Sequence, residues 1–190
     1  MEIHKFSDIA LSDPFFDSLK ADYPGFSKWY EKKSVENARA YIQKNEKGLL
    51  QAFLYLKVEG SSENYSDIKP PFKPKKRLKI GTFKVESTGL RLGERFLKII
   101  FDNALQQKVD EIYVTLFEDR EELVALRLLL EAWGFVYHGK KDTQESVYVK
   151  TVGKWDNNRT VKKNFPNVKD KANKFILPIF PQYHTDLFPD

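Results

Sequence analysis

Apolar residues along this chain recur at two spacings, and each spacing predicts one kind of element. Alternating or continuous runs of β-forming residues predict strands, and apolar residues three and four positions apart predict helices. The strands are expected over residues 2–9, 37–44, 49–58, 77–86, 111–117, 135–138 and 146–149, and the helices over 14–23, 26–30, 93–107 and 119–133. Residues 60–74 are polar, contain proline and are expected to form a loop.

The order of these elements predicts an α/β (α+β) fold with a mixed sheet. The strands over 77–86 and 111–117 are joined by the helix over 93–107, and a crossover of this kind places its two strands parallel. Turns such as 45–48 join other strands as antiparallel hairpins. The sheet is therefore expected to be mostly antiparallel, with six to seven strands, and flanked by helices.

Composition then narrows the class of protein. The chain is 41% hydrophobic, carries a net charge of +5 and has fifteen Phe, nine Tyr and three Trp, which provide enough apolar area for a core. It has no cysteine, which excludes disulfides, Cys-ligated zinc and a thiol nucleophile. No apolar run approaches the ~18 residues of a membrane span, and no signal peptide is expected. A cytoplasmic location fits these features.

The segment from 77 to 97 carries the most specific chemistry. A buried strand leads into a loop with Gly89 and Gly93, and a helix begins at the second glycine. The backbone N–H groups of such a loop and of a helix N-terminus favour a pyrophosphate group. The segment has neither a P-loop ending nor the spacing of a dinucleotide fingerprint. A glycine turn in an ordinary crossover unit is the alternative interpretation.

The same segment resembles the acyl-CoA-binding motif of the GNAT N-acetyltransferase family. The stretch Thr88-Gly89-Leu90-Arg91-Leu92-Gly93 matches that motif at its final glycine, and Arg91 stands where the family has a further glycine. The stretch Leu129-Leu130-Glu131-Ala132-Trp133-Gly134-Phe135 is similar to a second family motif. The resemblance covers residues 1–150 and includes the order of the elements. It implies an acetyltransferase that uses acetyl-CoA as cosubstrate.

The resemblance also implies site residues. Phe83 and Val85 would lie on the strand that pairs with the pantetheine arm. The amides of Leu90, Arg91, Leu92, Gly93 and Glu94 would hold the pyrophosphate. Glu86 is the expected general base, and Tyr137 is a candidate acid by residue type only, as is Tyr113. Position 130, where the family often has the tyrosine that protonates the thiolate, holds Leu130, and Leu123 stands at the approximate place of a family asparagine.

Three functions remain open at this point. The first is an N-acetyltransferase acting on a primary amine of a small molecule, a peptide or an aminoacyl-tRNA. The second is a binding module that has lost its catalytic groups. The third is a nucleic-acid-associated domain that uses the basic loop over 69–79, which contains six Lys or Arg residues and no acidic one. A solvated loop is the simpler interpretation of that charge run.

Two further features have alternative interpretations. The aromatic residues Phe15, Phe16, Tyr23, Phe26, Trp29 and Tyr30 form either an acceptor pocket or ordinary core packing. The three histidines are too far apart in sequence for metal-ligand spacing, so no metal site is expected.

Two regions are expected along the chain. An acyl-CoA-binding domain spans 1–150. A C-terminal extension over 151–190 is first basic and then apolar, and it either packs on the domain or links it to a further domain.

Overall fold

The computed structural model describes residues 2–86, 92–117 and 121–152. Leu90, Arg91 and nearly all of the C-terminal extension lie outside these residues. Strands β1 to β8 span Glu2–Lys5, Arg39–Lys44, Leu50–Glu59, Ile68–Lys69, Arg77–Val85, Glu111–Leu116, Val136–Lys141 and Ser146–Thr151. Helices α1 to α4 span Asp17–Asp22, Phe26–Val35, Leu92–Gln106 and Glu121–Ala132, and two short 3-10 helices span Phe6–Asp8 and Pro14–Phe16.

The predicted mixed sheet is confirmed. Its strands lie in the order β1-β2-β3-β5-β6-β8-β7-β4, and only β5 and β6 are parallel. The short strand β4 forms within the segment expected to be a loop and pairs with β7, which raises the strand count to eight. The strand expected over 2–9 ends at Lys5, where the chain turns into the first 3-10 helix.

Local signals in the sequence account for several element ends. The Asp13 side chain accepts a hydrogen bond from the Phe15 amide (2.9 Å) and so caps the second 3-10 helix, whose first residue is Pro14. Gly134 follows α4 with a φ of 83°, a left-handed conformation that favours glycine at this position. These short-range signals set where the elements begin and end along the chain.

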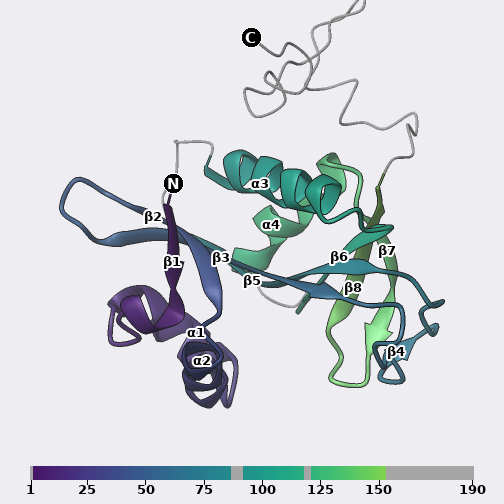
Figure 1. The fold of residues 1–190 in the computed structure, drawn as a ribbon, viewed down its shortest axis with the longest axis horizontal. Helices are drawn as coiled ribbons and strands as arrows, with labels where there is room; N and C mark the ends of the chain where they lie inside the picture. The colour runs from purple at the N-terminus through teal and green to yellow at the C-terminus, as the bar shows by residue number, and fades with distance from the viewer. Residues whose placement is uncertain (1, 87–91, 118–120, 153–190) are drawn as a thin grey trace, which may run out of the picture.

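Helices cover both faces of the sheet (Figure 1). On one face, α3 and α4 pack over the middle strands, and Leu78, Ile80 and Phe96 belong to this main core. On the opposite face, α1 and α2 pack over β2 and β3 through a second core that includes Phe16 and Phe53. A third, smaller cluster lies at the other end of the sheet around Tyr113.

Strand β5 contains a bulge at Gly81. Tyr55 of β3 pairs with Thr82 and the next residue, Leu56, pairs with Ile80, so Gly81 is an extra residue on β5. The bulge changes which residues face α3: Leu78 and Ile80 do so before it, and Phe83 and Val85 after it. A bulge bends its strand and increases the local twist.

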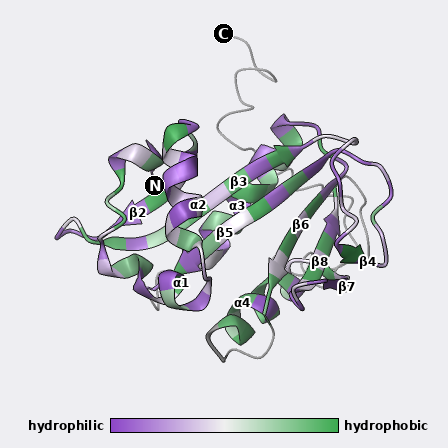
Figure 2. Ribbon diagram, turned by 90° about the horizontal axis from the view of Figure 1, so that it is seen from below, coloured by the Kyte–Doolittle hydropathy of each residue, from purple (hydrophilic) through white to green (hydrophobic). Residues whose placement is uncertain are grey.

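The pairing between β5 and β6 ends at this bulge. The two strands pair from Arg77 and Glu111 to Ile80 and Val114, and β5 then continues along β3 only. Figure 2 shows β5 and β6 running apart beyond this point. Residues 81–85 therefore keep β3 on one side and have an open backbone edge on the other.

A buried polar cluster lies at the closed end of this split. The Arg77 guanidinium lies over the Phe72 and Tyr65 rings and binds the Glu111 carboxylate (2.9 Å). Nearby, Glu59 accepts hydrogen bonds from the hydroxyls of Tyr113 (2.6 Å) and Tyr65. Burial, followed by the hydrogen bond to Glu59, raises the pKa of Tyr113 well above its usual range. The cluster fastens β5 to β6 where they still pair.

Replacing Gly81 with alanine tests how tightly the bulge is packed. A Cβ at this position would lie 2.7 Å from Cδ1 of the Tyr55 ring, and that ring is buried against Phe6 and Trp29. We expect Gly81→Ala to lower the free energy of unfolding by about 1–3 kcal/mol, the usual cost of overpacking. Urea denaturation measures this change.

Gly60→Ala is the matched control. Its added Cβ would meet nothing closer than the Ser62 hydroxyl at 4.0 Å, so the unfolding free energy should barely change. Equal effects of the two substitutions would contradict the tight packing at Gly81.

Candidate functional site

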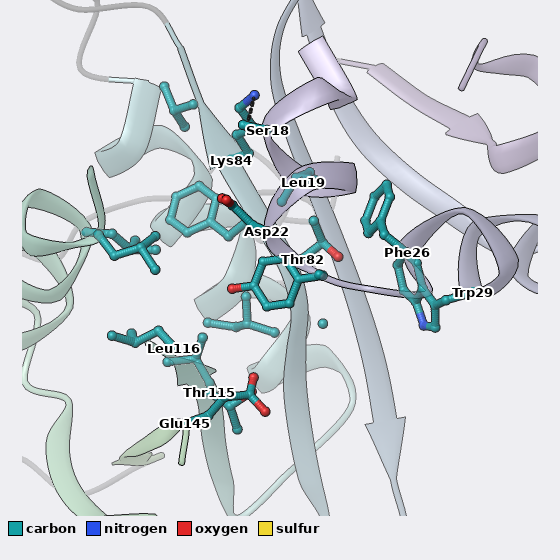
Figure 3. Close-up of a pocket in the computed structure, with 18 of the residues that line it drawn as sticks. Ser18, Leu19, Asp22, Phe26, Trp29, Thr82, Lys84, Thr115, Leu116 and Glu145 are labelled. Carbon is teal, nitrogen blue, oxygen red and sulfur yellow. Dashed lines mark hydrogen bonds between the residues drawn. The ribbon is translucent and has the colours of Figure 1, made fainter. Parts of the chain in front are cut away.

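A cavity of about 910 Å³ lies where β5 and β6 diverge. Its walls come from α1 and the start of α2, the second half of β5, the end of β6, the beginning of α3, α4, and the segment between β7 and β8. Figure 3 shows side chains from the two strands and from α1 and α2 converging on it. A cavity of this size holds a ligand as large as a cofactor together with a small second molecule.

The wall on the α3 side is apolar and has backbone groups available for pairing. Phe83 and Val85 line it from β5, and Leu126 and Leu129 line it from α4. Gly93, in the first turn of α3, also lines it. The first turn of a helix presents N–H groups without partners in the helix, and its dipole favours a negative charge. The α3 side therefore suits a long ligand with an anionic end.

Gly93 allows α3 and α4 to pack closely. A Cβ at Gly93 would lie 2.8 Å from the Leu129 Cδ2 atom. Its sequence neighbours Leu92 and Glu94 do not line the cavity; Leu92 is buried in the main core and Glu94 is half-buried.

The wall on the α1 and α2 side is polar and aromatic. Asp22, Tyr23, Phe26 and Trp29 line it, and Tyr23 is the only tyrosine among the described residues that does so. Figure 3 shows Asp22 and Glu145 on opposite sides of Thr82. An aromatic wall with facing carboxylates suits a small amine.

Glu145 is fixed in place by two hydroxyl groups. The Thr115 hydroxyl donates to its Oε1 atom (3.0 Å), and the Thr143 hydroxyl donates to Oε2 (2.7 Å). The side chain is 15% exposed, and the Lys141 ammonium lies 4.0 Å from Oε2. Each carboxylate oxygen can accept a further hydrogen bond. Glu145 is thus an oriented carboxylate at the cavity wall.

Glu86 also lines the cavity, with a different environment. Its carboxylate is 43% exposed and forms a 2.6 Å ion pair with Lys84. The Lys84 ammonium in turn donates to the Phe15 carbonyl and to the Ser18 hydroxyl (2.8 Å). Lys84 therefore connects β5 to the segment that leads into α1.

The structure brings some of the sequence-predicted site residues together and separates others. Phe83, Val85, Glu86 and Gly93 meet at the cavity. Tyr137 does not line it; this residue is half exposed on β7, and its ring contacts Tyr148.

Three other positions considered in the sequence analysis are Tyr113, Leu123 and Leu130. Leu130 is fully buried in the main core, and Tyr113 is bound to Glu59 away from the cavity, whereas Leu123 lines the cavity. Leu90 and Arg91 lie outside the described residues. None of the described residues at these positions places a tyrosine hydroxyl at the cavity.

The aromatic residues of the N-terminal helices are divided between the second core and the cavity wall. Phe15, Phe16 and Tyr30 are buried in the second core, and the Tyr30 hydroxyl donates to the Ile9 carbonyl (2.9 Å). Tyr23, Phe26 and Trp29 also belong to or pack against this core, and they line the cavity as well.

The basic loop over 69–79 uses most of its charges within the protein. Lys75 and Arg77 bind Glu111, Lys76 binds the Gln107 carbonyl, and Lys69 binds Asp142. Arg77 is 1% exposed. These contacts weaken the nucleic-acid interpretation of the loop.

Within residues 2–86, 92–117 and 121–152, no group of three or more His, Asp or Glu side chains is arranged to hold a metal ion. No helix in that same part of the chain is long and apolar enough to cross a membrane.

Solved structures with a similar fold are GNAT acetyltransferases. A GNAT-family acetyltransferase from Streptococcus agalactiae is 18% identical with a TM-score of 0.50, covering 71% of this chain and 76% of its own. One from Staphylococcus aureus is 11% identical with a TM-score of 0.51, covering 79% and 98%. A ribosomal-protein-alanine N-acetyltransferase from Brucella melitensis is 11% identical with a TM-score of 0.51, covering 80% and 100%.

These comparisons show that the chain has the GNAT fold, as the sequence resemblance implied. No family model and no curated protein matches the sequence.

Replacing Lys84 tests its connecting role at the cavity edge. Lys84→Met removes hydrogen bonds to the Phe15 carbonyl and the Ser18 hydroxyl from a side chain that is 17% exposed. Hydrogen bonds to a charged group contribute about 1.5–3 kcal/mol, so we expect a loss of about 1–2 kcal/mol in unfolding free energy by urea denaturation.

Lys20→Met removes a different lysine, one whose 2.8 Å ion pair with Asp17 lies at the surface. Exposed ion pairs contribute about 0–1 kcal/mol, so this control should change little. A Lys84→Met protein as stable as the Lys20→Met protein would contradict the connecting role.

Proposed function

We propose that the protein is an N-acyltransferase that transfers an acetyl group from acetyl-CoA to a primary amine. The observation that carries this proposal is the open backbone edge of residues 81–85, which faces the cavity opposite the start of α3. The pantetheine arm of CoA contains two amides, and an extended chain with amides can add to an open strand edge.

The anionic end of CoA has a matching place. The pantetheine arm leads to a pyrophosphate, and the first turn of α3 supplies amides and a positive dipole end. The amides of Leu92, Gly93 and Glu94, together with those of Leu90 and Arg91, are the groups we assign to it. Phe83 and Val85 would then contact the arm from β5.

The amine would approach from the side of α1 and α2. The amine nitrogen attacks the thioester carbonyl, the C–N bond forms, the C–S bond breaks, and the amine loses one proton. Glu145 is the base that the geometry favours, because its two oxygens are oriented by Thr115 and Thr143. Glu86, the base expected from the sequence, is more exposed and forms a tight 2.6 Å ion pair with Lys84, whereas the Lys141 ammonium lies 4.0 Å from Glu145.

A tyrosine at position 130 is not required for this reaction. The leaving group is a thiolate, and thiols have a pKa of about 8.5. Such a thiolate can take its proton from water. A buried Leu130 is therefore compatible with catalysis, and Tyr23 is the tyrosine nearest to this role because it lines the cavity.

Acetyl-CoA binding tests the cofactor side of the proposal. We expect calorimetry to detect micromolar binding of acetyl-CoA. Ala125 lines the cavity from α4, and Ala125→Trp should fill part of it and weaken binding about ten-fold or more.

Val124→Trp is the control, because Val124 is exposed on the same helix and does not line the cavity. It should bind acetyl-CoA as the unmodified protein does. Absence of binding at millimolar acetyl-CoA would overturn the transferase proposal and favour the binding-module alternative.

The two carboxylates are distinguished by a pair of variants. With an acceptor amine in hand, Glu145→Gln should lower kcat/KM by about 10²–10⁴, the usual contribution of a general base. Glu86→Gln should have a much smaller effect. Release of the free CoA thiol measures both rates, and the opposite order of effects would assign the base to Glu86.

A further inference from the structure

Three lysines lie close together on the sheet face that α1 and α2 partly cover. Lys57 on β3 pairs across the strands with Lys79 on β5. Burial and the neighbouring charges of Lys57 and Lys141 all lower the pKa of Lys79. Lys79 alternates with Leu78 and Ile80, which face α3, so its side chain lies on the opposite face of the sheet. Its ammonium lies 5.7 Å from the centre of the Tyr113 ring.

Two of these lysines have carboxylate partners and one does not. Lys57 binds Glu59 (3.0 Å) and Glu63 (3.3 Å). Lys141 binds Asp67 (3.1 Å) and lies 4.0 Å from Glu145. Within the part of the chain that the structure describes, the Lys79 ammonium has no hydrogen bond and no carboxylate within 4.0 Å.

Lys79 lines the cavity. Burial is the main cause that lowers its pKa below the usual lysine range, and the Glu59 and Glu145 carboxylates oppose this effect. Glu59 and Glu145 act on this half-buried ammonium from beyond contact distance, and a ligand that brings an anion into direct contact stabilises its charge further. The cavity therefore favours an anionic group beside Lys79.

The anion belongs to the acceptor rather than to CoA. The phosphates of CoA are assigned to the start of α3, which packs on the opposite face of the sheet from Lys79. Glu145 lies on the same face as Lys79, because its partner Thr115 alternates with Val114, which faces α3. The acceptor end thus has a carboxylate suited to an amine and an ammonium suited to an anion.

Building on the proposed transferase function, we propose that the acceptor is a small amine that also carries a carboxylate, such as an amino acid, and that Lys79 binds this carboxylate. The amine is then directed to Glu145 and to the thioester. Lys79 determines which amines are accepted and takes no part in bond formation.

Matched pairs of acceptors test this proposal. The probes are the proteinogenic α-amino acids and their carboxamides, which keep the amine and the side chain and lose only the carboxylate. An amino-acid amide loses its amine proton more readily than the acid, so a preference for the acid cannot arise from a more available amine. We expect the acid of at least one pair to react with a kcat/KM about ten-fold or more above that of its amide, as for a charge-assisted hydrogen bond.

Lys79→Met identifies the residue responsible. The substitution keeps an unbranched side chain that is one heavy atom shorter and removes the charge. It should raise KM for the acid about ten-fold or more and leave both parameters for the amide nearly unchanged. Lys140→Met, at an exposed position on β7 that does not line the cavity, should retain the preference for the acid. Thermal unfolding confirms that both variants are folded.

Several outcomes would overturn the proposal. These are equal rates for acids and amides, no reaction with any amino acid, or an equal loss for acid and amide in Lys79→Met. The last result would give Lys79 a part in the chemistry or the fold. Acetyl-CoA binding, measured without an acceptor, separates these failures from a failure of the transferase proposal itself.

Discussion

The bulge at Gly81 is the constraint on which the rest of the site depends. The pairing of β5 with β6 ends at the residue before the bulge, and after it β5 pairs with β3 only, so the sheet opens at its centre. The Tyr55 ring, 2.7 Å from where a Cβ would lie, leaves room only for glycine. The bulge also turns Phe83 and Val85 toward α3, which gives the opened edge its apolar wall. One backbone irregularity thus creates both the gap and its lining.

A buried ion pair joins β5 and β6 at the end where the two strands still pair. Arg77 and Glu111 are paired in register on β5 and β6 and form a buried ion pair beneath the Phe72 ring. Breaking a buried pair leaves an uncompensated charge, so the two strands are fixed together up to Ile80. Because β5 and β6 are joined up to Ile80 and Val114, the two strands that form the cavity walls diverge from a fixed point. That fixed geometry is what a direct transfer between two bound molecules requires.

The sequence predicted the elements better than the site. Periods of two and of three to four residues identified the major strands and helices, because each element buries one face. The bulge was missed, although its signal is present: Leu78 and Ile80 are in phase, and Phe83 and Val85 are in the opposite phase across Gly81. Glu145 had no signal of its own, because its orientation depends on Thr115, thirty positions away in the sequence. Tyr137 was chosen by residue type, which does not specify the direction of a side chain.

The partners of the basic residues in the loop over 69–79 could not be predicted from the sequence. A net charge of +5 and a loop rich in lysine suggest an anionic partner at the surface. In the folded chain, Lys69, Lys75 and Arg77 of that loop each form an ion pair with a carboxylate. Lys79 lines the cavity and has no carboxylate within 4.0 Å among the described residues. What matters for a ligand is therefore not how many cations the loop has but which of them lines the cavity, and among Lys69, Lys73, Lys75, Lys76, Arg77 and Lys79 that is Lys79. Lys79 lies beside the last paired residues of β5 and β6, inside the cavity that the proposed acceptor would enter.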